Sequence, residues 1–282
     1  MSRLGYQWAM LGRLERLIAI QVGLFILFGL LDILGISLYS FFELSSSATD
    51  LLLRPWSLFT YLFLHHDLWH LIFNMLCLYY AGQFFLNFFD FERLFSLFLL
   101  GGIAAGIVYV LLYSLVPSLS VIPSAMVGSS AGVMAVLIFM ATYNPNQPVQ
   151  LLFFRLKLWH LGAFFVVIDL FQLSSGVNFG GRVAHLTGAA IGYFSARQLL
   201  IGIEVAGGFQ RFVGLLLRSN GFASSGQRKS AFKVYKSRSK QSKVTKQPSD
   251  QERIDAILDK ISASGYDSLS AEEKEYLFKK GR

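Results

Sequence analysis

The feature that most constrains the fold of this chain is a long, almost uncharged middle. Between residues 17 and 203 only 13 side chains are Asp, Glu, Lys or Arg, whereas residues 204–282 contain 25. Most of the 13 lie at breaks between apolar runs. About 20 consecutive apolar residues form a helix long enough to cross the hydrocarbon core of a bilayer. The pattern therefore predicts an integral membrane protein whose C-terminal part lies outside the membrane.

The overall composition excludes several other classes of protein. Hydrophobic residues make up 54% of the chain and charged residues 15%, whereas soluble domains have about 25% charged residues. An ordinary soluble domain, a disordered protein and a coiled coil are therefore excluded. Cys77 is the only cysteine, so the chain has neither an internal disulfide nor a CxxC pair. The sequence predicts no metal and no cofactor, because His65 and His66, expected in an external loop, lack matched ligands.

We divide the chain into four parts: a cytoplasmic lead-in (1–16), a membrane domain (17–203), a basic flexible linker (204–249) and a small helical hairpin (250–282). The basic start of the chain resembles that of a signal peptide. The first apolar run, residues 17–41, is nevertheless too long for a cleaved segment and lacks a small-x-small cleavage site. We interpret it as the first transmembrane helix.

Six segments are predicted to span the membrane: 17–41, 69–89, 94–116, 126–143, 158–173 and 183–203. Basic residues precede the first span, follow spans two and four, and are dense after span six, where residues 211–246 hold ten Lys or Arg and no Asp or Glu. Since Lys and Arg favour cytoplasmic loops, both termini are predicted to be cytoplasmic. We expect the membrane to be a bacterial inner or plasma membrane.

Polar residues inside transmembrane helices are costly and usually functional. Spans two, four and six all run inward from their external ends, and each places polar residues near that end. The residues at this level are His70, Asn74, Ser130 and His185. Three others are expected to make polar contacts between helices or at the interface: Asp32, His160 and Asp169.

The four residues at this level have the chemistry of acyl transfer. A serine hydroxyl needs a base to remove its proton, and histidine is the usual base near neutral pH. Asn, His and backbone N–H groups can stabilise the oxyanion that forms. No acidic residue is expected at this depth, so the sequence predicts a Ser–His dyad.

Small residues are expected to bring the two halves of this dyad together. His185, Gly188 and Gly192 lie at i, i+3 and i+7, on one face of their helix. Span four offers small residues of its own, which let two helices approach closely: Ala131, Gly132 and Ala135. Close packing of spans four and six is therefore predicted.

With these motifs in order, residues 50–200 of the chain resemble the rhomboid intramembrane serine proteases. The matching motifs are His70-xxx-Asn74, Gly128-Ser129-Ser130 and His185-xx-Gly188-xxx-Gly192, preceded by Pro55-Trp56 and Thr60-Tyr61, which resemble the end of that family's first external loop.

The resemblance implies an all-α, six-helix membrane bundle with a water-filled cavity that opens externally. Ser130 would be the nucleophile and His185 the general base. The oxyanion hole would consist of His70, Asn74 and the backbone N–H of Ser130. Gly128 would shape the loop before the nucleophile, while Gly188 and Gly192 would support the packing. The implied partners are single-span membrane proteins, cut near the external face.

The chain also departs from the family pattern. Ala131 replaces the glycine that commonly follows the nucleophile, and Met134 replaces a tyrosine that packs against the base in many members. Ser57 replaces an arginine after the tryptophan of the first loop, and Asn87 stands where a glutamate is expected near the end of span two.

Other interpretations of the same residues remain open. Ser130 could simply cap a helix, His185 could be a packed histidine, and Ser129 is a rival nucleophile. Residues 128–132 also fit the GxSxG nucleophile elbow, which requires a preceding strand in a soluble sheet. A catalytically inactive relative that binds membrane clients is the main alternative function. A transporter would show inverted halves and polar residues at the midplane, which the sequence lacks.

The C-terminal part has two regions of different composition. The basic linker is expected to bind anionic lipid at the inner leaflet rather than nucleic acid, after a short interfacial helix with Phe209, Phe212, Val213 and Leu216. Helical spacing of Ile254, Ile257, Leu258 and Ile261 then predicts a helix that ends at Gly265. Ser270 and Glu273 form a capping box for a second helix that ends near Phe278. We expect a docking or regulatory role for this hairpin.

Overall fold

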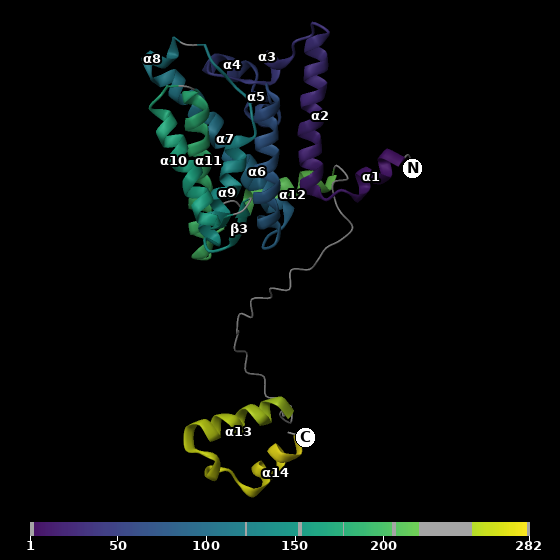
Figure 1. Ribbon diagram of the computed structural model, residues 1–282, viewed down its shortest axis with the longest axis vertical. Coiled ribbons are helices and arrows are strands. Elements are labelled where there is room, and N and C mark those ends of the chain that lie inside the picture. Colours follow the sequence, from purple (N-terminus) through teal and green to yellow (C-terminus); the bar gives the residue numbers. More distant parts are fainter. Residues whose placement is uncertain are drawn as a thin grey trace. The chain divides into compact units, whose positions relative to one another are not determined.

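Helices account for most of the chain (Figure 1). The computed structural model describes residues 3–121, 123–151, 154–176, 178–204, 207–219 and 250–280. The chain divides into two compact units, residues 1–226 and residues 227–282. Most of the linker predicted over 204–249 lies outside the described residues.

The first unit contains α1 (Arg3–Met10), α2 (Arg13–Ile33), α3 (Tyr39–Phe42), α4 (Ala48–Leu53), α5 (Ser57–Thr60), η1 (Tyr61–Phe63), α6 (Leu68–Leu86), α7 (Phe91–Leu115), α8 (Pro117–Ser120), α9 (Ser130–Tyr143), α10 (Leu158–Leu173), α11 (Phe179–Leu200) and α12 (Gly207–Ser219). Two short antiparallel pairs add β structure to the all-α fold that the sequence predicts: β1 (Leu44–Ser45) with β2 (Ala125–Met126), and β3 (Pro148–Leu151) with β4 (Phe154–Lys157). The first pair joins the loop after α3 to the loop before α9.

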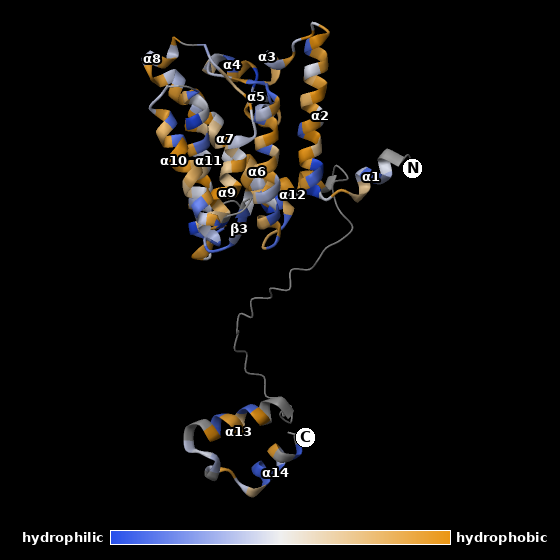
Figure 2. Ribbon diagram, viewed as in Figure 1, coloured by the Kyte–Doolittle hydropathy of each residue, from blue (hydrophilic) through white to orange (hydrophobic). Residues whose placement is uncertain are grey.

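Each of the six predicted spans overlaps one of the longer helices of this unit: α2, α6, α7, α9, α10 and α11. Among the described residues, α2 and α7 are long and apolar enough by themselves to cross a membrane, while α9 and α10 are apolar but shorter. Hydrophobic residues dominate these helices (Figure 2). The structure therefore agrees with the predicted helices, and a full set of six crossings remains a prediction.

The first helix ends earlier than its apolar run. The sequence predicts a span over 17–41, but α2 ends at Ile33. Gly35 takes a positive φ of 79°, and the N–H groups of Gly35 and Ile36 donate to the carbonyls of Asp32 and Leu31. A glycine in this left-handed conformation is a common helix terminator, so the remaining apolar residues enter a loop and the short α3.

Aspartate caps fix where two long helices begin. The Asp67 carboxylate accepts a 2.7 Å hydrogen bond from the backbone N–H of His70 at the start of α6. Asp90 caps α7 in the same way, through the N–H of Arg93. A carboxylate at this position satisfies an unpaired N–H and interacts favourably with the helix dipole. The first cap also sets the position of His70 in the first turn of α6.

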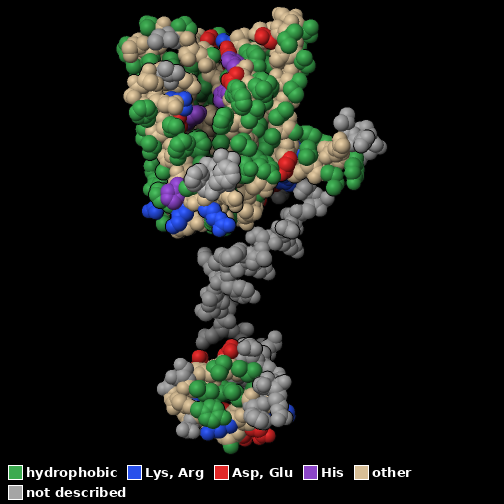
Figure 3. Space-filling view, viewed as in Figure 1, with side chains coloured by type: hydrophobic (Ala, Val, Ile, Leu, Met, Phe, Trp, Pro, Cys, Tyr) green, Lys and Arg blue, Asp and Glu red, His purple; other side chains and the backbone are tan. Residues whose placement is uncertain are grey.

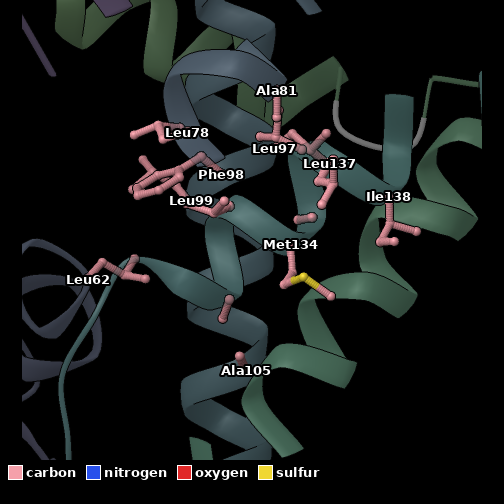
Figure 4. Packing of buried hydrophobic residues seen from close by; sticks show 14 of the residues in the cluster. Leu62, Leu78, Ala81, Leu97, Phe98, Leu99, Ala105, Met134, Leu137 and Ile138 are labelled. Atoms are coloured by element: carbon pink, nitrogen blue, oxygen red, sulfur yellow. The ribbon is translucent and has the colours of Figure 1, made fainter. Parts of the chain in front are cut away.

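Helix α9 is the centre of the first unit. Every side chain from Ala131 to Met140 is buried, because α6, α7, α10 and α11 all pack against this helix. Figure 4 shows Leu78, Phe98 and Met134, which belong to α6, α7 and α9, in this packed interior. A helix that is buried on every side needs no polar face, which explains its uniformly apolar sequence.

Helices α9 and α11 touch at their backbones, as the small residues predict. A Cβ atom added at Gly188 would lie 2.1 Å from the Ala131 carbonyl oxygen, and one at Gly192 would lie 2.2 Å from that of Ala135. Both contacts are spaced by four residues, so the two helices run in the same direction in register. The predicted close packing of spans four and six is confirmed.

The second unit contains α13 (Asp250–Ser264), η2 (Tyr266–Ser268) and α14 (Ala271–Lys280). The predicted capping box is confirmed, since Ser270 and Glu273 exchange backbone and side-chain hydrogen bonds at 2.7 and 3.3 Å. Lys260 reaches from α13 to the Glu273 carboxylate at 2.9 Å. This hydrogen bond holds the pKa of Glu273 below its usual range and joins the two helices into a hairpin.

The α9–α11 contact generates a stability prediction. Gly192→Ala should lower the free energy of unfolding by about 1–3 kcal/mol, because its methyl group would collide with backbone atoms that cannot rotate away. Gly23→Ala in α2 is a matched control, since no atom lies within 4 Å of the position of its added Cβ. Thermal unfolding of the purified protein in detergent measures both. Equal stability of the two variants would contradict the contact.

Candidate functional site

A cavity of about 780 Å³ opens where α6, α9 and α11 begin. Ser130, His185 and His70 all line it, and Gly128 and Arg182 contribute to its wall. Figure 3 shows histidine, acidic and basic side chains together within an otherwise hydrophobic face of this unit. Three of the four polar residues that the sequence places at one level therefore face a single cavity.

Ser130 is the first residue of α9, which is a short helix. With a rise of 1.5 Å per residue, the 14 residues of α9 span about 21 Å, less than the roughly 30 Å hydrocarbon core of a bilayer. The first N–H groups of a helix have no partner within it. The hydroxyl of Ser130 thus lies among backbone donors at the positive end of the α9 dipole.

The packing register brings His185 to nearly the same level as Ser130. Ser130 precedes Ala131 by one residue, and His185 precedes Gly188 by three. Because Ala131 and Gly188 are in contact, the two residues differ by about 3 Å along the parallel helix axes.

His185 has a carboxylate partner on α10. Both carboxylate oxygens of Asp169 lie 3.1 Å from Nδ1 of His185. Arg182, one turn before His185 on α11, donates to the same carboxylate at 2.9 Å. The Asp169 side chain is only 2% exposed. The expectation that no acidic residue lies at this depth is wrong.

Asp169 could have been located from the sequence by following the direction of each span. Span five is predicted to run outward, so a residue four positions before its end is expected near the external level, where spans two, four and six begin. The expected contact of Asp169 between helices is confirmed, but the partner, His185, was missed. Arg182 was also missed, although it lies three residues before His185 and thus on the same helix face.

His70 packs against the loop that leads into α9. Gly128 has a φ of 122°, and a Cβ atom there would lie 2.7 Å from the imidazole Cε1 of His70. The N–H of Gly128 donates to the Tyr61 carbonyl at 3.0 Å. Only glycine permits this conformation and this approach. Gly128 therefore shapes the loop between His70 and the first residue of α9.

Asn74 lies behind His70, one turn deeper in α6. Its side-chain amide donates to the His70 carbonyl at 2.8 Å, and its side chain is buried. Among the described residues that line the cavity, Asn74 does not occur. Its observed contact is with the backbone of α6, and the amide has a second proton that can donate elsewhere.

A second Ser–His pair lies beside the first. The Ser129 hydroxyl is 3.4 Å from Nε2 of His65, and both residues are fully buried. His65 therefore lies inside the protein rather than in an exposed part of the loop. Burial, with a smaller effect of His70, lowers the pKa of His65 to about 3, so its imidazole is neutral at physiological pH.

The other polar residues have local partners. His160 lies at the start of α10, where its Nδ1 accepts a hydrogen bond from the Lys157 N–H at 3.0 Å. His66 lies 3.4 Å from Glu43. Cys77 is partly buried and packs against the hydrophobic core. Within the described parts of the chain, no group of three or more His, Cys, Asp or Glu side chains could hold a metal ion.

Comparison with known proteins identifies the class to which this fold and site belong. The model of the Rhomboid domain matches residues 53–201, just over half of the chain. The chain therefore belongs to the rhomboid family, a family of intramembrane-protease-like integral membrane proteins. A second model, described as a family of unknown function (DUF6576), matches residues 244–279 and thus includes most of the C-terminal hairpin. No curated protein matches the chain.

The contact between Gly128 and His70 generates a second prediction. Gly128→Ala should destabilise the protein by about 1–3 kcal/mol, because it adds both backbone strain and a collision with the imidazole. Gly35→Ala is the matched control: its φ is also positive, at 79°, but no atom lies within 4 Å of the added Cβ. Thermal unfolding should show the larger loss for Gly128→Ala.

A His70→Ala background tests the cause of this difference. Removing the imidazole should recover part of the loss caused by Gly128→Ala, because the collision disappears while the backbone strain remains. Equal losses in both backgrounds would show that His70 is not the group that Gly128 accommodates.

Proposed function

We propose that this protein is an intramembrane serine endopeptidase in which Ser130 is the nucleophile and His185 the general base. The observation that carries this proposal is that both side chains line one cavity at the start of α9, in a chain of the rhomboid family. As the Ser130 oxygen attacks a peptide carbonyl, its proton would pass to Nε2 of His185. The imidazolium would then return this proton to the leaving amine.

The beginning of α9 suits the charge that develops during this attack. The oxyanion would lie near the backbone N–H of Ser130, at the positive end of the helix dipole. The imidazole of His70 lines the same cavity and is a second donor. The free amide proton of Asn74 is the third candidate in this oxyanion hole. Each such donor typically contributes about 3 kcal/mol to the stabilisation of the transition state.

Access separates Ser130 from its rival, Ser129. Ser129 and His65 are fully buried and are absent from the described lining of the cavity, so a peptide bond could not reach them without local opening. A general base must also become positively charged during the reaction, and burial of His65 disfavours that charge. We assign to this second pair the role of holding the loop before α9.

The depth of the site explains the proposed substrates. A hydroxyl below the membrane surface can reach peptide bonds that lie inside or beside a transmembrane segment. Backbone hydrogen bonds of a helix shield its carbonyls, so single-span segments that unwind readily should be preferred. The cavity must also admit water, since hydrolysis of the acyl-enzyme needs a second nucleophile.

The orientation proposed from the sequence places this cavity on the external side and both termini in the cytoplasm. Lys and Arg side chains gather at the end of the first unit that carries β3, away from the cavity (Figure 3). This distribution supports a cytoplasmic location for that end.

We also propose that the basic segment 211–246 binds anionic lipid of the inner leaflet. The segment expected to form an interfacial helix is helical in the structure, as α12, in which Val213 is buried while Phe212 and Leu216 are exposed. An amphipathic helix of this kind suits a membrane surface. Residues 220–249 lie outside the described residues, so this proposal rests on their charge.

Covalent labelling tests the nucleophile. A fluorophosphonate should label the purified wild-type protein, and Ser130→Ala should abolish labelling. Ser129→Ala is the matched control and should keep labelling, because its hydroxyl does not reach the cavity. Labelling that persists in Ser130→Ala would reject the proposed nucleophile.

Cleavage of a single-span reporter tests the reaction and the orientation together. Wild-type protein should release the external domain of the reporter, whereas His185→Ala should reduce turnover by at least about 100-fold without loss of the fold. His160→Ala, which removes a histidine at the start of α10, should retain activity. Release of a fragment on the cytoplasmic side would overturn the orientation. A wild type that binds reporters but neither cleaves nor labels would favour the inactive, client-binding alternative.

A further inference from the structure

Asp169 is the carboxylate that contacts the imidazole of His185, which lines the cavity. It projects from α10, whereas His185 and Arg182 project from α11. Nδ1 of His185 lies 3.1 Å from each carboxylate oxygen. At 2% exposure, the carboxylate is shielded from water, so these contacts are not weakened by competing solvent.

The chemistry of the carboxylate determines which nitrogen of His185 carries its proton. An ionised carboxylate can only accept hydrogen bonds, so Nδ1 must be the donor. Arg182 supplies the positive charge that a buried carboxylate requires, through its 2.9 Å hydrogen bond to Oδ1. In neutral His185, Nε2 therefore has a free lone pair, and this is the form of the imidazole that can accept a proton.

We propose that Asp169 is a positioning residue that completes a Ser130–His185–Asp169 triad. The Oγ–H proton of Ser130 passes to Nε2 of His185 while Oγ bonds to the substrate carbonyl carbon. The Nδ1–H of the resulting imidazolium stays hydrogen-bonded to the carboxylate, whose negative charge stabilises the imidazolium. The proton on Nε2 then goes to the leaving nitrogen. Asp169 gains and loses no proton during this cycle.

The helix arrangement gives this contact its direction. Asp169 comes from α10, and the contact of α11 with α9 is made by the glycines that follow His185. Nδ1 of the imidazole is thus held by a residue of α10, and Nε2 is left available to the cavity. Rotation of the ring would break both 3.1 Å contacts and leave a buried carboxylate with Arg182 alone. Such a constraint lowers the number of orientations that the base can adopt.

A purely structural role is the competing explanation, since the pair Asp169–Arg182 also joins α10 to α11. The two explanations predict different results for Asp169→Asn. An amide of the same shape can donate to Nδ1, which would place the proton of neutral His185 on Nε2 and prevent it from accepting the serine proton. A structural role would reduce stability and leave this tautomer and the turnover number unaffected.

The test uses the full chain purified in detergent and a transmembrane reporter substrate. If the positioning role is correct, Asp169→Asn should lower kcat by about 100-fold or more and leave KM nearly unchanged, because the buried carboxylate does not touch substrate. Nitrogen NMR of histidine-labelled protein should show His185 as the Nδ1–H tautomer in the wild type. An Nε2–H tautomer in the wild type would overturn the proposal even if Asp169→Asn failed to fold.

Glu92→Gln is the matched control. It converts a carboxylate to an amide in another interhelical ion pair, Arg13–Glu92, which joins the first turns of α2 and α7. It should change stability but neither kcat nor the tautomer of His185. The triad proposal rests on the proposed protease function, but different results would reject each of them. Turnover that survives Ser130→Ala would reject the function, whereas a kcat of Asp169→Asn within threefold of an active wild type would reject the triad alone.

Discussion

The backbone contact between α9 and α11 is the interaction on which the rest of the structure depends. Gly188 and Gly192 leave no side chain between the helices, so Ala131 and Ala135 lie directly against them. In a membrane, where lipid is as apolar as leucine, close van der Waals packing of this kind is a main source of helix association. The same contact sets the register. It therefore brings Ser130, at the start of α9, and His185, one turn before Gly188 in α11, to the same cavity.

A polar site inside an apolar bundle also needs its charges compensated. Asp169 pairs with Arg182, which lines the cavity, and His185 bonds to the same carboxylate. An isolated charge at this depth would cost several kcal/mol. Because the charges of Asp169 and Arg182 are paired, the local net charge stays near zero until the imidazole of His185 takes up a proton. The site thus contains a counter-ion for the positive charge that the proposed reaction creates, without exposing that counter-ion to water.

Much of this arrangement could be predicted from the sequence, because the governing signals are local. Long apolar runs predict the six helices, and the spacing of His185, Gly188 and Gly192 predicts the face of α11 that contacts α9. The early end of α2 was missed because one glycine with a positive φ outweighs the apolar residues beyond it. The β1–β2 pair was missed because it joins residues 80 positions apart. Asp169 was placed between helices without a partner, since its orientation depends on how the 158–173 helix rotates against its neighbour. That rotation is set by packing, which no single segment reveals.

Two neighbouring serines with two histidines show why residue type alone does not define such a site. Ser129 and His65 lie 3.4 Å apart, yet both are fully buried. Nδ1 of His65 is buried without a hydrogen-bond partner among the described residues, so no acceptor at that nitrogen stabilises a positive charge on the ring. Ser130 and His185 face the cavity, and the imidazole has a carboxylate behind it. Ser129 and Ser130 are consecutive residues at the beginning of α9, and consecutive side chains on a helix point about 100° apart. That rotation is sufficient to assign one hydroxyl to the packed loop and the other to the cavity.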